Sequence, residues 1–362
     1  MMAGARGMMT IERQIKFWIA ALAVFIALLW LLSEILLPFV AGIVLAYLLN
    51  PVAQRLEQAG INRTISGLLI IVVAIALLIV LVLLLAPILA AQLSAFIERV
   101  PSYVARLQAV IADPGHEWLA KILGDRLPDA SKSVGDLVTQ GAAWLGTFAR
   151  SLWSGGKALV SVLSLMVITP VVAFYMLCDW DRMIAAIDNW IPRPQRETVH
   201  SLAREIDTAI AGFIRGQTSI SLMLGGFYAV ALALTGLNFG FLIGFTAGVI
   251  SFIPYVGSLT GLVVAVGVAL AQFWPNWTPL IIIVMIFVVG QLLEGYVLAP
   301  KLVGERIGLH PVWLMFSLVA FGYLFGFVGL LVAVPVSAAI GVLLRFALKQ
   351  YRASPIYTGE TR

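Results

Sequence analysis

The sequence is poor in the residues on which disulfide-bonded, metal-binding and soluble catalytic proteins depend. It has one cysteine, Cys178, and three histidines among 362 residues. Only 11% of its residues are charged, against about 25% in soluble domains. A single cysteine excludes an internal disulfide framework, and no histidine stands in a metal-binding motif such as HExxH. The sequence therefore predicts no metal and no cofactor.

Apolar residues are abundant instead. They make up 61% of the chain, and the mean hydropathy is +1.02. A soluble domain of this length cannot bury so much apolar surface. The sequence therefore predicts an all-α polytopic membrane protein whose partner is the lipid bilayer. It excludes a soluble enzyme, a nucleic-acid-binding domain and a secreted disulfide scaffold. The net charge of +5 is typical of cytoplasmic loops in a membrane protein.

Charge divides the chain into membrane segments and loops. All 23 lysines and arginines fall into six blocks, at 1–16, 51–64, 93–157, 179–215, 300–311 and 345–362. Since a helix needs roughly 20 residues to cross the hydrocarbon core, the apolar sequence between these blocks predicts about eight helical membrane segments. They are 17–33, 35–50, 65–92, 158–178, 216–236, 239–272, 279–299 and 312–344.

Two of these segments, 239–272 and 312–344, are long for one span and short for two. Helix breakers interrupt the first at Ile253-Pro254-Tyr255-Val256-Gly257 and the second at Gly322, Gly326 and Gly329, with Pro335 beyond. We expect each to be a broken helical hairpin that enters and leaves on one side, with its broken backbone buried in protein or lining a wet cavity.

The positive-inside rule favours the hairpins. With a cytoplasmic N-terminus, where 17–33 is an uncleaved signal anchor, two hairpins place Lys301 and Arg306 inside. Straight spans place them outside, and that alternative stays open. In the hairpin arrangement, each of two units with opposite orientation is a span followed by a broken segment, a pattern that points to the site of a secondary transporter.

The chain accordingly divides into five parts. They are N-terminal membrane helices (1–92), an extracytoplasmic amphipathic helical insert (93–157), a membrane helix with a cytoplasmic helical loop (158–215), a transport core (216–346) and a cytoplasmic tail (347–362). Apolar residues recur at helical spacing from Leu93 to Ile111 and again from Trp144 to Trp153. Such helices lie on the membrane or their own protomer, or form an oligomer contact.

Glu294 is the one acidic residue well inside an apolar segment, and Gln291 shares its helix face. A carboxyl group at this depth is costly and normally faces a cavity or a partner. We expect Glu294 to contribute to a substrate or proton site. The alternative is a structural pair with Lys301 or Arg306 near the cytoplasmic end.

Uncharged polar residues near the helix breaks complete the predicted site. The predicted substrate or ion-binding residues are Glu294, Gln291, Gln217, Pro254, Tyr255, Gly257 and Ser251, and the predicted hinge residues are Gly326, Gly329 and Pro335. Gly240, Gly244 and Gly248 repeat every four residues, which is typical of close helix packing or of a sliding surface.

Catalytic patterns are missing from the apolar segments. None holds a histidine or an aspartate well inside it, no lysine or arginine lies within a span, and the sequence has no P-loop. We therefore predict that the chain is not an enzyme.

Several stretches, in order along the chain, resemble the autoinducer-2 exporter family of bacterial transporters, which includes permease-like members. They are Pro38 to Ala41, Ala46 to Pro51, Phe174 to Asp179, Arg215-Gly216-Gln217, Ile253 to Gly257, Gly290-Gln291, Glu294-Gly295, Pro300-Lys301, Val303-Gly304, Gly308 to Pro311, Gly326, Gly329 and Ala333-Val334-Pro335. The resemblance implies an inner-membrane secondary transporter, homo-oligomeric, that exports a small solute such as autoinducer-2 or exchanges sodium for protons. A passive channel or an oligomeric scaffold is the alternative of a different class.

Overall fold

The computed structural model describes residues 11–112, 156–303 and 310–359, and every regular element in these ranges is helical. The all-α prediction is confirmed. The helices are α1 (Ile11–Leu31), α2 (Ser33–Gln58), α3 (Arg63–Ala112), α6 (Gly156–Cys178), α7 (Trp180–Asp188), the 3₁₀ turn η2 (Arg193–Gln195), α8 (Arg196–Leu234), α9 (Gly240–Ile250), α10 (Val256–Phe273), α11 (Trp277–Leu293), the π-helix η3 (Glu294–Val303), α12 (Pro311–Arg352) and α13 (Pro355–Thr358).

Six helices of the described residues are long and apolar enough to cross a membrane. They are α2, α3, α8, α10, α11 with its π-helical continuation, and α12. A seventh candidate is the pair formed by α6 and α7, which meet at an angle of 62°. Most of the predicted first span, 17–33, lies in α1, which is not one of the six.

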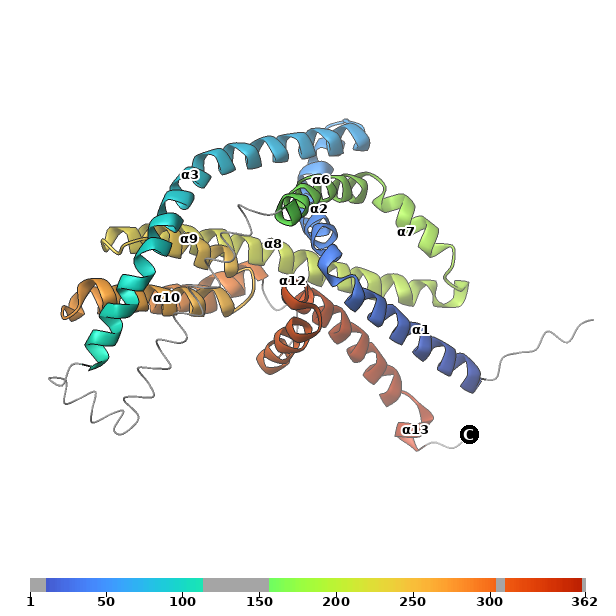
Figure 1. Cartoon of the computed structure of the whole chain (residues 1–362). Helices are drawn as coiled ribbons and strands as arrows, with labels where there is room; N and C mark the ends of the chain where they lie inside the picture. The colour runs from blue at the N-terminus through green and yellow to red at the C-terminus, as the bar shows by residue number, and fades with distance from the viewer. Residues whose placement is uncertain (1–10, 113–155, 304–309, 360–362) are drawn as a thin grey trace, which may run out of the picture.

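Two predicted boundaries between span and loop fall inside continuous helices. The predicted span 65–92 and the start of the insert 93–157 form one helix of 50 residues, α3, which contains Pro87 and bends in Figure 1. The predicted loop 179–215 likewise continues into the next span through α8. A helix does not end where its apolar run ends, because its backbone hydrogen bonds continue equally well in water. The second amphipathic stripe, 144–153, lies outside the described residues.

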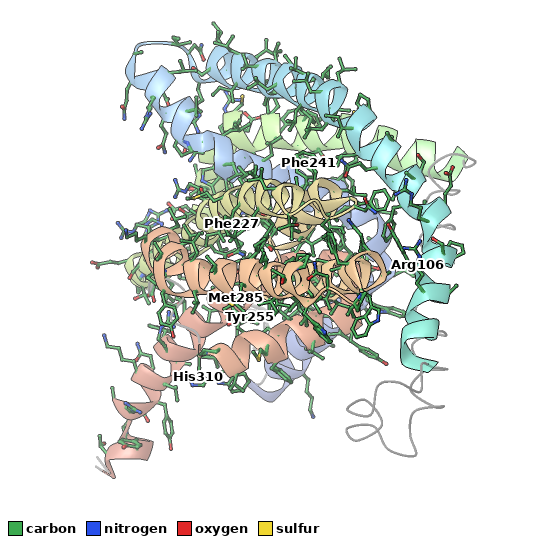
Figure 2. The ribbon with its side chains drawn as sticks, turned by 90° about the vertical axis from the view of Figure 1, so that its left-hand side faces the viewer. Arg106, Phe227, Phe241, Tyr255, Met285 and His310 are labelled. Atoms are coloured by element: carbon green, nitrogen blue, oxygen red, sulfur yellow. The ribbon has the colours of Figure 1, made fainter. Side chains whose placement is uncertain are left out.

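The predicted segment 239–272 is a hairpin of two helices, α9 and α10, called the first hairpin below. Its two ends are tied together: the Asn238 N–H donates to Gln272 Oε1 at 2.7 Å, and Gln272 Nε2 donates to the Gly236 carbonyl at 2.8 Å. Arg106 of α3 donates to the Ala271 carbonyl at 3.3 Å at the same end, and Figure 2 shows Arg106 on the part of α3 beside the hairpin. Both ends of the first hairpin therefore lie together, away from its tip.

Helix α9 packs on α8 through backbone-to-backbone contact at the predicted glycine face. A Cβ at Gly240 would stand 2.7 Å from the Leu232 carbonyl oxygen, and one at Gly244 or Gly248 would overlap the α8 backbone at Ala229 or Gly225. Small residues permit this close approach of the two helices. In lipid the hydrophobic effect does not drive helices together, and close packing of this kind contributes to their association instead. The glycine face is a packing surface.

Replacing Gly244 by leucine is expected to prevent assembly of the first hairpin on α8. The new side chain must push the two backbones apart, and overpacking of this kind costs about 3 kcal/mol or more. The yield of monodisperse protein and its unfolding in detergent measure the effect. Gly226→Leu is the matched control, because nothing lies within 4 Å of its Cβ position. Equal stability of the two variants would contradict the packing role.

The predicted segment 312–344 also folds back, within α12, and is called the second hairpin below. Gly326 has φ +59° and ψ −138°, a conformation that interrupts the helix and that glycine adopts without steric cost. A Cβ at Gly329 would overlap the Phe321 carbonyl, and one at Gly322 would stand 2.9 Å from Leu330. These approaches bring the two arms of α12 side by side. Pro335 lies in the second arm.

The tip of the first hairpin packs against the second hairpin and α8. Ile253 and Phe213 are buried in one apolar cluster with Leu318, Ala333 and Val334.

Segments predicted on the same membrane side also lie together. Arg345 of α12 is paired with Glu205 of α8 at 3.0 Å, and Arg63 donates to the Leu177 carbonyl at 2.8 Å. The two hairpins therefore meet in the interior of the protein. The charged segments lie at one end of the helices, and the contacts between α3 and the first hairpin lie at the other end.

Candidate functional site

The break in the first hairpin lies between Ile250 and Val256. The chain turns through Ser251 to Tyr255, where Tyr255 adopts a left-handed conformation with φ +67° that is uncommon for a residue with a side chain. Pro254 is half-buried, and Tyr255, labelled in Figure 2, is 46% exposed. The predicted residues Pro254 and Tyr255 therefore shape the turn and make no polar contact with the cluster described below.

Two predicted site residues, Gln217 and Ser251, stabilise the broken backbone. Gln217 Nε2 donates to the Ser251 carbonyl at 2.6 Å, and Ser251 Oγ donates to the Ala247 carbonyl at 2.8 Å. Both residues are buried, and a Cβ on Gly257 would overlap Ser251. A carbonyl freed by a helix break needs a partner when no water reaches it. Gln217 supplies that partner from α8, so these residues position the hairpin tip.

Glu294 and Gln291 join a second polar group at the start of the π-helix. Gln291 Nε2 donates both to Ser258 Oγ at 2.8 Å and to Glu294 Oε2 at 2.9 Å. Ser258 comes from α10, Gln291 from α11 and Glu294 from the first turn of η3. A π-helical turn is rare and is frequently found at functional sites. Here it begins at the intramembrane carboxyl group.

Tyr228 of α8 is the fourth member of this group, which we call the carboxyl cluster (Tyr228, Ser258, Gln291 and Glu294). Its side chain is fully buried and stacks on Phe287, with ring centroids 4.7 Å apart. Gly290 leaves the space that the phenol ring fills. The hydroxyl lies beside Gln291 and Glu294 but has no hydrogen bond of good geometry with any described residue. A fully buried hydroxyl without a partner is unusual and points toward a bound ion, water or ligand.

The structure does not support the alternative in which Glu294 pairs with Lys301. No ion pair joins these two residues, although both are described, and Arg306 lies outside the described residues. Glu294 follows Trp277 by 17 residues, or about 26 Å along the helix axis. If Trp277 marks the outer interface, the carboxyl lies in the inner part of a core about 30 Å thick.

Chemically, the carboxyl cluster offers one carboxylate with hydroxyl and amide oxygens. Such oxygens can exchange a proton or surround a small cation. A group of three or more His, Cys, Asp or Glu side chains that could hold a metal ion does not occur in the described ranges. Gln291 is exposed on the single chain while Glu294 is half-buried, so the cluster opens at the lateral surface of the protomer.

The predicted hinge residues lie apart from the carboxyl cluster. Gly326 and Gly329 build the turn of the second hairpin, and Pro335 lies in its second arm. The hydrogen bonds that connect the cluster involve none of them.

Sequence reasoning missed Tyr228 and Phe287 as parts of the site. Tyr228 is one aromatic residue in an apolar span, and nothing near it in the sequence marks it as polar or functional. The only signal is Gly290, one residue before Gln291, which creates the space for the phenol. A glycine on a different helix identifies no partner without a structure.

Replacing Tyr228 by phenylalanine is expected to leave stability unchanged or slightly raised, because removing a buried polar atom that lacks a partner relieves a desolvation cost. If the hydroxyl binds the coupling ion, the ion concentration for half-maximal transport rises by about tenfold, or about 1.4 kcal/mol. Ion-dependent flux in proteoliposomes measures this shift. Tyr296→Phe is the control, since Tyr296 is 80% exposed. Unchanged ion dependence in the Tyr228 variant would exclude the hydroxyl from the ion site.

Comparison with known proteins identifies the chain at the level of family. A profile described as AI-2E family transporter matches residues 19–349, which include both hairpins and the carboxyl cluster. The chain belongs to this family. Relatives of the AI-2E chain include the Bacillus subtilis protein named as transport protein YrrI, which is 27% identical over 317 residues and is matched over 87% of both chains. The Escherichia coli protein named as permease PerM is 27% identical over 332 residues, covering 90% of this chain and 92% of its own.

These matches place the AI-2E chain in a bacterial family of multi-pass membrane transporters and permeases. This family is one of transporters and permeases, which is not an enzyme class.

Proposed function

We propose that the chain is an inner-membrane secondary transporter that exports a small polar solute, with autoinducer-2 as the first candidate, and that Glu294 couples export to an ion gradient. One observation carries the proposal: an intramembrane carboxyl group accepts a hydrogen bond from Gln291, which also donates to Ser258 of the first hairpin, and it lies beside a buried tyrosine hydroxyl that makes no hydrogen bond of good geometry. Intramembrane carboxyl groups near discontinuous helices are typical of ion-coupled transport.

In the proposed cycle, protonation or cation binding at Glu294 changes the bond between Gln291 and Ser258. Gln291 uses one amide nitrogen for both Glu294 and Ser258. Each bond uses one of the two amide hydrogens. Neutralising the carboxylate weakens the bond to Glu294, so the Gln291 amide is held less firmly in the position from which it donates to Ser258. Because Ser258 belongs to the first hairpin, the charge state of Glu294 acts on the element that lies beside the break.

The moving unit in this proposal is the pair of hairpins with α8 and α11, and the fixed unit is α2, α3 and α6. The second unit has its own apolar core, formed by residues such as Ala53, Ile70, Ala173 and Leu177. Residues of the fixed unit also pack into the clusters of the moving unit, namely Tyr103 of α3 and Tyr47 and Leu48 of α2. Rigid-body movement, which is how many transporters alternate access, must therefore change these apolar contacts. The polar contacts of α3 with the first hairpin, at Leu242 and Ala271, must then change during the cycle.

Sodium/proton antiport is the second candidate within the same family. The oxygen atoms of Glu294, Ser258 and Tyr228 favour it, because oxygen ligands suit small hard cations and only one of the three is charged. In this version the cation is the cargo, and a solute is unnecessary.

A homo-oligomer would complete the site. Gln291 is exposed on the single chain, and an amide at membrane depth must be covered by protein or water. A second copy over this face would seal the carboxyl cluster from lipid.

The positive-inside pattern supports a cytoplasmic N-terminus in the inner membrane.

Efflux from proteoliposomes loaded with autoinducer-2 tests the proposal. We expect saturable efflux that requires the protein and accelerates when a proton or sodium gradient is imposed. Saturable cation exchange without movement of autoinducer-2 would favour the antiporter. Linear flux that does not depend on any gradient would identify a passive channel. Absence of any flux would favour an oligomeric membrane scaffold.

A further inference from the structure

A cavity of about 450 Å³ lies apart from the carboxyl cluster, between α2, the α6–α7 junction and α8. Its volume falls within the roughly 300–1,000 Å³ typical of small-molecule sites. Three of the stretches that carry the family resemblance contribute to its wall, through Tyr47, Met176 and Arg215. We call it the charged cavity, because acidic and basic side chains line it.

A network of hydrogen bonds centred on Arg63 closes one end of the charged cavity. Arg63 donates to Glu57 at 2.8 Å, to the Asn50 side chain at 2.9 Å and to the Leu177 carbonyl at 2.8 Å. These bonds use the guanidinium to join α2, α3 and α6. Arg63 therefore has a structural role, with Glu57 as its ion-pair partner.

The rest of the charged cavity holds two acids, Asp181 and Asp207, and one base, Arg215, which forms an ion pair with neither of them. Asp207 accepts a hydrogen bond from the Tyr47 hydroxyl at 2.9 Å through Oδ1. Arg215 donates to the Ala211 carbonyl at 3.1 Å and forms no ion pair with any residue that the structure describes. Asp207, Ala211 and Arg215 are four residues apart on one face of α8.

The separation between the two charges suits a small ligand. The helix rise places the Cα atoms of Asp207 and Arg215 about 12 Å apart. The bond from Arg215 Nε to the Ala211 carbonyl holds the Arg215 side chain on the face of α8 that carries Asp207. The remaining gap is too wide for an ion pair and of the order of a short ligand.

Aromatic rings flank the acidic end. Tyr47 and Trp180 meet edge to face, with ring centroids 6.4 Å apart, and Asp181 follows Trp180 in the wall. Carboxylates beside aromatic faces attract ammonium groups. A guanidinium binds a carboxylate or another oxyanion through paired hydrogen bonds. The two ends of the cavity therefore favour opposite charges.

We propose that the charged cavity binds a small zwitterion, with its ammonium group at Asp207 and Trp180 and its acid group at Arg215. This site is distinct from the carboxyl cluster. The proposal does not depend on which solute the transporter moves or on coupling at Glu294. Arg215 precedes Gln217, which holds the tip of the first hairpin, by two residues on the same helix. A ligand here would contact the helix that positions the break.

Calorimetric titration of the purified full chain in lipid nanodiscs tests this site. The probes are β-alanine and γ-aminobutyrate as zwitterions, with butylamine and butyrate as analogues that carry one charge. We expect saturable binding of at least one zwitterion and at least about tenfold weaker binding of both single-charge analogues. Arg215→Gln and Asp207→Asn should each weaken the zwitterion at least about tenfold, while Arg215→Lys retains part of the affinity.

Arg204→Gln is the matched control, since Arg204 is an exposed arginine of α8 outside the cavity wall. It should bind like the wild type. Absence of binding by both zwitterions would overturn the proposal, as would equal binding of butylamine or butyrate. Unchanged affinity in both the Arg215→Gln and Asp207→Asn proteins would overturn it as well. Loss of transport in Glu294→Gln protein with zwitterion binding intact would separate this site from the proposed coupling site.

Discussion

Replacing Glu294 by glutamine is expected to abolish gradient-driven transport while leaving downhill flux of the solute. Glutamine keeps the shape of the side chain and still accepts the hydrogen bond from Gln291, but it cannot take up a proton or neutralise a cation. We expect accumulation against a gradient to fall by at least about tenfold, because an intramembrane carboxyl is the group that exchanges charge. Solute flux in proteoliposomes, with and without an imposed gradient, measures both quantities.

Glu98→Gln is the control for this substitution. Glu98 is an exposed residue of α3, outside the carboxyl cluster, and its neutralisation changes the net charge equally. It should transport like the wild type. A Glu294→Gln protein that retains full gradient dependence would return Glu294 to a structural role.

Cross-linking α3 to the first hairpin is expected to stop transport. Gln92 Oε1 accepts a hydrogen bond from the Leu242 N–H at 3.0 Å, so cysteines at positions 92 and 242 lie within reach of a short bifunctional reagent. If the hairpins move against α3, the cross-link holds the protein in one state. Transport should then fall by at least about tenfold, measured in a Cys178→Ser background so that no other thiol reacts.

A cross-link inside the moving unit provides the comparison. Cysteines at positions 238 and 272 join the two ends of the first hairpin, which already share a hydrogen bond. This link should leave transport unchanged, because both ends move together. Full transport in the protein cross-linked between 92 and 242 would eliminate movement of the hairpins against α3.

Much of the fold follows from the sequence because the bilayer restricts the choices. Apolar length predicts spans, and proline or glycine within a long apolar run predicts the breaks, which the structure places at 251–255 and at Gly326. The residues at which helices end outside the membrane were not predictable in the same way. Nothing in the sequence stops α3 at residue 92 or starts α8 at residue 216, since neither backbone hydrogen bonds nor helix propensity change there.

The site was predictable only where polarity stands out from its surroundings. Glu294 and Gln291 are conspicuous in an apolar span, and their shared face follows from helical spacing. Ser258 and Tyr228 reach them from other helices, and such contacts depend on tertiary packing that a helical pattern does not encode. Gln217 and Ser251 were predicted as binding residues. The structure brings these two residues together at the break in the first hairpin, but neither forms a hydrogen bond with Glu294.

Proton movement is the most direct test of ion-coupled transport. The purified protein is reconstituted in liposomes that contain a pH-sensitive dye, and a sodium gradient is imposed with and without autoinducer-2. Coupling at Glu294 predicts a dye response that requires the protein, that depends on sodium or on the added solute, and that disappears in the Glu294→Gln protein. No proton movement under any gradient, in protein that is folded and correctly inserted, would contradict proton coupling and leave facilitated diffusion as the better description.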